Sequence, residues 1–89
     1  MAHSAGHSFE LGKLYSDRGE FEPAIVHLND AAEVYYEARD FSKYLECQNL
    51  LLRIYAEMER FEDINATKEK LQDLVLKEGF ELNARTYYT

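Results

Sequence analysis

Hydrophobic residues recur every three or four positions along most of the chain, which is the spacing that places them on one face of an α-helix. This pattern predicts a first helix over about residues 8–18, a second over about 22–38, a third after residue 40 and a fourth after residue 60. No stretch of useful length alternates apolar and polar residues as a half-buried β-strand does. The sequence therefore predicts an all-α fold.

Residues that interrupt helices stand at the boundaries of these segments. Gly19 can adopt the left-handed conformation that closes a helix. Pro23 suits the first helical position, because its missing N–H group would have no partner there. Asp40 can cap the third helix, because its carboxylate can accept a hydrogen bond from a free backbone amide of the first turn. Gly79 is the expected end of the fourth helix.

These boundaries also give the domain organisation. We expect a flexible N-terminal segment, two successive helix pairs and the beginning of a further helix, at residues 1–7, about 8–40, about 41–79 and 80–89. Each helix pair has an apolar face that it cannot bury alone, so such pairs are expected to stack on one another.

The two helix pairs share a motif with a period of forty residues. Leu11, Tyr15, Phe21 and Glu22 recur as Leu51, Tyr55, Phe61 and Glu62. Lys13 corresponds to Arg53, so the positive charge at this position is kept. The repeated Tyr15 and Tyr55 are expected to pack in the core, because large aromatic rings contribute most when they are buried.

The first unit carries a recognisable pattern: Leu11, Gly12, Tyr15, Gly19, Phe21, Ala24, Leu28 and Ala31. This pattern resembles the tetratricopeptide repeat, and its forty-residue period is similar to the longer repeats of kinesin light chains and spindle-orientation adaptor proteins. The resemblance covers about residues 8–79. It implies two antiparallel helix pairs and the start of a third, stacked as a right-handed solenoid. The second unit departs from the pattern, and Glu59 in place of Gly19 predicts a less tight turn.

The resemblance also implies a binding groove, lined by the first helix of each unit. The residues two positions before the repeated tyrosines, Lys13 and Arg53, would point into it, and Phe9 and Asn49 would face it one turn earlier. Asn can pair with both groups of a peptide bond. Arg can hold a carboxylate with two hydrogen bonds, while Lys acts as a point charge. We therefore expect a groove for a peptide or helix with acidic residues or a carboxy-terminus.

Two observations leave alternatives open at this groove and beside it. Glu46 or Glu57 could instead pair with Arg53 and occupy its charge. Tyr35 and Tyr36 are adjacent on a helix, so they cannot both be buried on one narrow face. One of them, or Tyr44, either marks a contact surface or packs between the two units.

Composition narrows the classes of function. The chain of 89 residues has 10 basic and 17 acidic side chains, and its net charge of −7 argues against nucleic acid and anionic membranes as partners. The single cysteine, Cys47, excludes an internal disulfide framework and fits a cytoplasmic setting. His3 and His7 have the spacing of a helical metal pair but no third ligand nearby. Because the sequence has no phosphate loop and no nucleophile elbow, we expect that the chain is not an enzyme and that it binds no cofactor and no metal.

These features predict a non-catalytic protein-interaction module, a scaffold or adaptor that holds a partner segment in its concave groove. Two units and the start of a third are fewer than a stable solenoid usually needs. The chain therefore either belongs to a longer array or completes its core by association. The alternative function is accordingly structural self-association, a homodimer formed by helix packing or by exchange of helices.

Overall fold

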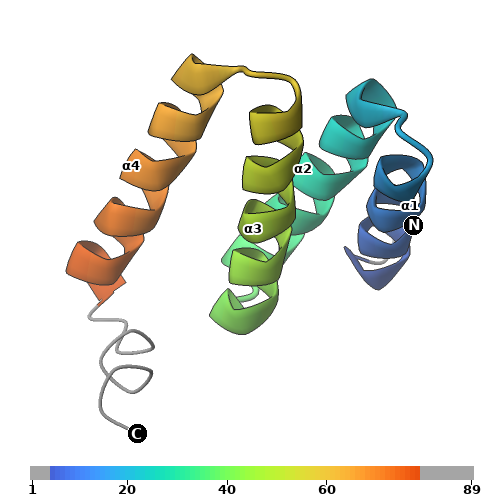
Figure 1. Ribbon diagram of the computed structural model, residues 1–89. Coiled ribbons are helices and arrows are strands. Elements are labelled where there is room, and N and C mark those ends of the chain that lie inside the picture. The colour runs from blue at the N-terminus through green and yellow to red at the C-terminus, as the bar shows by residue number, and fades with distance from the viewer. Residues whose placement is uncertain (1–4, 79–89) are drawn as a thin grey trace, which may run out of the picture.

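The computed structural model describes residues 5–78, which form four α-helices in series (Figure 1). The helices are α1 (Ala5–Asp17), α2 (Phe21–Glu37), α3 (Phe41–Glu57) and α4 (Phe61–Glu78). No β-strand occurs between residues 5 and 78, and the all-α prediction is confirmed. Residues 1–4 and 79–89 lie outside the described part, and with them His3, the expected stop at Gly79 and the expected further helix.

The predicted boundaries hold to within a few residues. α1 begins at Ala5, before the expected residue 8, and α2 begins at Phe21, which makes Pro23 its third residue. Pro23 still lies in the first turn, where helical amides have no partner within the helix. The predicted cap of α3 is confirmed, because the Asp40 carboxylate accepts a hydrogen bond from the backbone N–H of Lys43 at 3.4 Å.

The helices repeat every twenty residues, half the period found in the sequence. α2, α3 and α4 begin at Phe21, Phe41 and Phe61. Two residues before each of these starts, the backbone takes a positive φ, at Gly19 (76°), Arg39 (61°) and Glu59 (58°). The structural unit is therefore one helix and one turn.

A tyrosine carbonyl closes each of the three turns. The backbone N–H groups of Glu20, Asp40 and Arg60 donate to the carbonyl oxygens of Tyr15, Tyr35 and Tyr55, at 2.8, 2.9 and 2.9 Å. This is the bond that spans the C-terminus of a helix in a Schellman motif. The expectation of a less tight turn at Glu59 is wrong, because this residue adopts the left-handed conformation that Gly19 adopts and leaves the hydrogen bonds unchanged.

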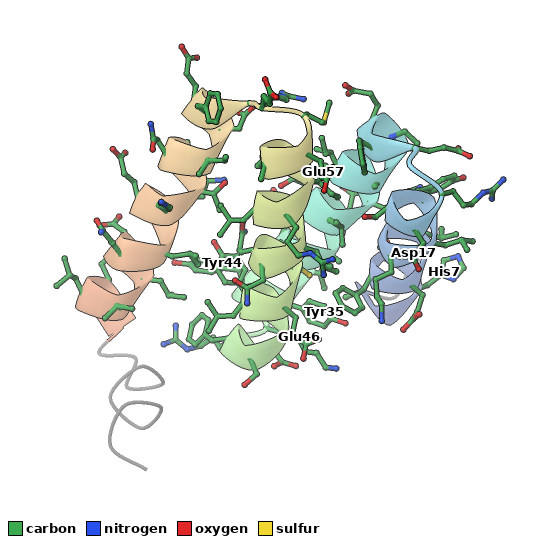
Figure 2. The ribbon with its side chains drawn as sticks, viewed as in Figure 1. His7, Asp17, Tyr35, Tyr44, Glu46 and Glu57 are labelled. Carbon is green, nitrogen blue, oxygen red and sulfur yellow. The ribbon has the colours of Figure 1, made fainter. Side chains whose placement is uncertain are left out.

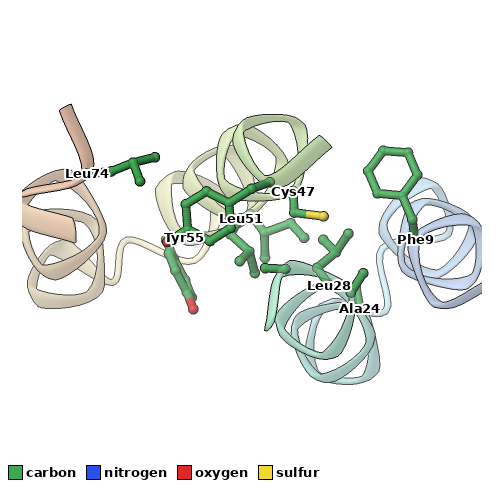
Figure 3. Packing of buried hydrophobic residues seen from close by; sticks show 11 residues of the cluster. Phe9, Ala24, Leu28, Cys47, Leu51, Tyr55 and Leu74 are labelled. Atoms are coloured by element: carbon green, nitrogen blue, oxygen red, sulfur yellow. The ribbon is translucent and has the colours of Figure 1, made fainter. Parts of the chain in front are cut away.

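Buried side chains from all four helices form one core (Figure 3). Ala24, Leu28 and Cys47 have no exposed surface, and Leu51 and Leu74 are almost fully buried. The alanines of α2 let the neighbouring helices approach closely, because they project only a methyl group into the interface. The core therefore runs through the whole row of helices.

The two repeated tyrosines occupy different depths in this core. Tyr55 is 7% exposed, as expected of a core residue. Tyr15 is only half-buried, and its ring stacks on His27 with the centroids 5.5 Å apart. The prediction of a core position is therefore confirmed for Tyr55 and only partly for Tyr15.

The four helices pack unequally. α2 lies extensively against both α1 and α3, whereas α4 packs less extensively and, among the described helices, only against α3 (Figure 1). None of the helices in residues 5–78 combines the length and the apolar character that a membrane span requires. The loose placement of α4 leaves a cleft, described below.

Candidate functional site

Lys13 and Arg53, forty residues apart in the sequence, line one hollow of about 370 Å³ between α1 and α3. α1 supplies Lys13, Ser16 and Asp17, the start of α2 supplies Phe21, and α3 supplies Leu50, Arg53, Ile54 and Glu57. The two basic residues were expected to share a groove, and the structure brings them to the same surface. We call this surface the α1–α3 hollow.

The other two expected groove residues lie elsewhere. Phe9 is 9% exposed and belongs to the core, so its ring is largely closed to a ligand. The ammonium group of Lys13 lies 5.5 Å from the centroid of this ring, an arrangement that orients the lysine through a cation–π interaction. Asn49 is exposed but is not among the residues that line the hollow.

The charges of the α1–α3 hollow are of both signs. Asp17 and Glu57 line it beside Lys13 and Arg53. Within residues 5–78, no ion pair joins Arg53 to Glu57 or to Glu46, although the first of these lies one helical turn away. The alternative in which one of these glutamates pairs with Arg53 is therefore not realised in this structure, and its guanidinium group remains available to a ligand.

A larger cleft, of about 580 Å³, lies between α2, α3 and α4 and was not predicted from the sequence. Its lining comprises Asn29, Asp30, Ala32, Glu33 and Tyr36 of α2, Tyr44 and Gln48 of α3, and Lys70, Asp73, Leu74 and Lys77 of α4. We call it the α2–α4 cleft. The signal for this cleft in the sequence was the group Tyr35, Tyr36 and Tyr44, one of which was expected to mark a contact surface or to pack between the two units.

Tyr36 and Tyr44 meet in this cleft with their ring centroids 5.2 Å apart. Tyr36 is 37% exposed and Tyr35 is half-buried, which confirms that these neighbours are not both buried. Burial raises the pKa of the Tyr44 hydroxyl, although its hydrogen bond with the buried Gln48 opposes the shift. The Tyr44 phenol is therefore protonated at neutral pH and acts as a neutral polar group.

No described residue is arranged for catalysis by a thiol or a metal. The Cys47 side chain is completely buried, and burial raises its pKa to about 11. Because the thiolate is the reactive form, this thiol is inert at neutral pH. Residues 5–78 contain no group of three or more His, Cys, Asp or Glu side chains that could hold a metal ion.

Comparison of the chain with protein-family models, curated proteins and solved structures finds no match in any of the three. The geometry of the described residues is therefore the basis for the functional proposal below.

Proposed function

We propose that this chain is a non-catalytic interaction module of the tetratricopeptide-repeat type that binds an acidic segment of a partner protein in the α1–α3 hollow. The observation that carries the proposal is the meeting of Lys13 and Arg53, from alternate helices, on one surface. The serial antiparallel helices and their three equivalent turns also support it, since stacked helical repeats commonly present such surfaces to partners. The right-handed solenoid implied by the resemblance belongs to this proposal.

The hollow favours a carboxylate placed between its two basic residues. Arg53 can bind it with two parallel hydrogen bonds, and Lys13, oriented by the Phe9 ring, adds a second positive charge. Asp17 and Glu57 repel further acidic groups at the edges of the hollow. We therefore expect a ligand with one acidic side chain or a carboxy-terminus, followed by apolar or basic residues.

The test is affinity capture from the source lysate with three baits. The wild type is compared with the Lys13→Glu, Arg53→Glu variant and with a control, Lys43→Glu, Lys68→Glu, which makes the same charge change at exposed positions outside both surfaces. A protein retained by the wild type and the control but lost with the first variant supports the proposal. Identical recovery with all three baits contradicts it, provided that circular dichroism shows equal helicity.

Self-association is the second candidate, and one observation favours it. Among the helices of residues 5–78, α4 packs only against α3, and it exposes 65% of Phe61 and 81% of Leu76, so a second chain could cover this apolar surface. Sedimentation velocity over a hundredfold range of concentration separates the two candidates. A dimer that persists on dilution supports the structural role, and a monomer supports the interaction module.

The proposed setting is the cytoplasm. The lone thiol of Cys47 is buried in the core and has no cysteine partner, which suits a compartment that keeps thiols reduced.

A further inference from the structure

The α2–α4 cleft is a second docking surface, and we propose that it binds an amphipathic α-helix of a partner protein that carries a basic edge and an acidic edge. The basic edge would lie along α2 and the acidic edge along α4. This inference goes beyond the proposed function, because none of the residues of the α1–α3 hollow lines this cleft.

The floor of the cleft is apolar and already ordered. Ala32, Tyr44 and Leu74 are each less than 10% exposed, and they come from three different helices. Tyr44 lies on the side of α3 that faces α4 (Figure 2). Because α4 does not pack against α2, the cleft stays open above this floor. An apolar helix face can therefore enter without displacing a described helix.

The cleft is also where the twenty-residue repeat is broken. Tyr36 stands at the position of Ser16 and Ala56, Tyr44 at that of Ala24 and Ile64, and Gln48 at that of Leu28 and Lys68. The repeat itself does not require a large aromatic ring at position 36, and more than a third of this side chain is exposed. Tyrosine is among the residues that contribute most to protein interfaces. The departures from the repeat therefore coincide with a contact surface.

The two walls of the cleft carry opposite charges. On the α2 wall, Asp30 and Glu33 give a charge of −2, and on the α4 wall Lys70 and Lys77 outweigh Asp73. No ion pair joins the two walls within residues 5–78, so both remain open to a ligand. Electrostatic complementarity of this kind fixes which partner fits and how it is oriented.

The occupant that matches these walls is a short helix from another protein. Lys70 and Lys77 are seven residues apart, which is about 10 Å along a helix axis, so each edge of the ligand needs charges over about two turns. A second copy of this chain is a poorer fit, because two chains of net charge −7 repel each other.

The experiment uses the full chain and three labelled helical peptides with one common apolar face. The first peptide has one basic and one acidic edge, the second has two acidic edges and the third two basic edges. Fluorescence anisotropy measures their affinities. We expect the wild type to prefer the first peptide by at least about tenfold over the other two.

Reversing either wall should switch this preference. The Asp30→Lys, Glu33→Lys variant should prefer the peptide with two acidic edges, and the Lys70→Glu, Lys77→Glu variant the peptide with two basic edges. The control Glu10→Lys, Glu62→Lys makes the charge change of the first variant at exposed positions outside the cleft and should keep the wild-type preference. Tyr36→Ser, which installs the residue found at the equivalent position of α1, should weaken binding of the first peptide at least about tenfold.

Four results would overturn the proposal. They are binding of no peptide by the wild type, equal binding of all three, preferences that the wall reversals leave unchanged, and a peptide-free dimer that Tyr36→Ser dissociates, which would assign the cleft to a second copy. The Lys13→Glu, Arg53→Glu variant should bind the first peptide as the wild type does. Loss of binding in that variant would place the peptide in the α1–α3 hollow, so the two proposals fail separately.

Discussion

Gly12 of α1 faces Leu28 of α2 so closely that a β-carbon does not fit between them. A Cβ atom at position 12 would lie 2.6 Å from Cγ and 2.8 Å from Cδ2 of Leu28, which is fully buried. We predict that Gly12→Ala lowers the free energy of unfolding by about 1–3 kcal/mol, because the added methyl group forces the two helices apart. Urea denaturation followed by circular dichroism measures the change.

Gly6 of the same helix provides the matched control. Of the residues that the structure describes, a Cβ atom there would meet only Tyr35, through its hydroxyl oxygen at 4.0 Å. Gly6→Ala should therefore be neutral or should stabilise by up to about 1 kcal/mol through its better helix propensity. Equal effects of the two substitutions would show that close packing at Gly12 is not what requires glycine.

The left-handed turn residues give a second prediction. Glu59 holds a positive φ of 58°, a conformation that costs a residue with a side chain about 1 kcal/mol and glycine almost nothing. Glu59→Gly should therefore raise the free energy of unfolding by about 0.5–1 kcal/mol. Arg39→Gly should raise the free energy of unfolding by less. The Arg39 guanidinium lies 5.2 Å from the centroid of the Phe41 ring, and the substitution removes this contact. A loss of stability in Glu59→Gly on thermal unfolding would contradict this account.

The same turns show what local sequence reveals and what it hides. Gly19 predicted a left-handed turn from residue type alone, whereas Glu59 concealed an equivalent one. At Glu59, the closure of the turn on Tyr55 and the packing of the flanking helices outweigh the local preference. The forty-residue period was visible because a whole motif recurs, from Leu11–Glu22 to Leu51–Glu62. The twenty-residue period depends on tyrosine–phenylalanine pairs alone, and the residues around these pairs differ between helices.

The two candidate sites also differ in how far the sequence predicts them. The resemblance to the tetratricopeptide repeat implied that Lys13 and Arg53 share one surface, and the structure places both of them in the α1–α3 hollow. The resemblance did not give the depth of Phe9, one turn from Lys13 on the same face, because burial depends on how closely the neighbouring helices approach each turn. The α2–α4 cleft could not be predicted, because it results from the distance of α4 from α2, which no local pattern encodes.

Arg60, in the turn between α3 and α4, contacts residues of α2, α3 and α4, and its loss gives a third prediction. Its guanidinium group binds the Asp63 carboxylate at 2.7 Å, lies 3.8 Å from Glu22 and lies 5.5 Å from the centroid of the Tyr55 ring. We expect Arg60→Ala to cost about 1 kcal/mol, the upper range for a partly exposed network. Arg18→Ala is the control. Within the described part of the chain Arg18 pairs only with Glu20, at 3.4 Å, so its loss should lower the free energy of unfolding by less than about 0.5 kcal/mol. The difference should shrink in 1 M salt, and a difference unaffected by salt would point to packing alone.

The buried thiol of Cys47 predicts a loss of stability at alkaline pH. Its pKa is raised from 9.0 to about 11 by burial first and then by the charge of Glu46, and burial also raises the pKa of Tyr35 and Tyr44. Above pH 9 the unfolded thiol loses its proton while the folded thiol keeps it, so the unfolded state binds fewer protons and stability falls as the pH rises. The contribution from Cys47 should be complete below pH 9 and decrease by roughly 2 kcal/mol by pH 11. Cys47→Ala lowers stability at every pH by leaving a cavity. It should nevertheless make the decline between pH 9 and 11 shallower, since among residues 5–78 only Tyr35 and Tyr44 then keep a raised pKa. Parallel stability profiles of the variant and the wild type, measured by urea denaturation across this range, would show that the thiol does not drive the alkaline loss.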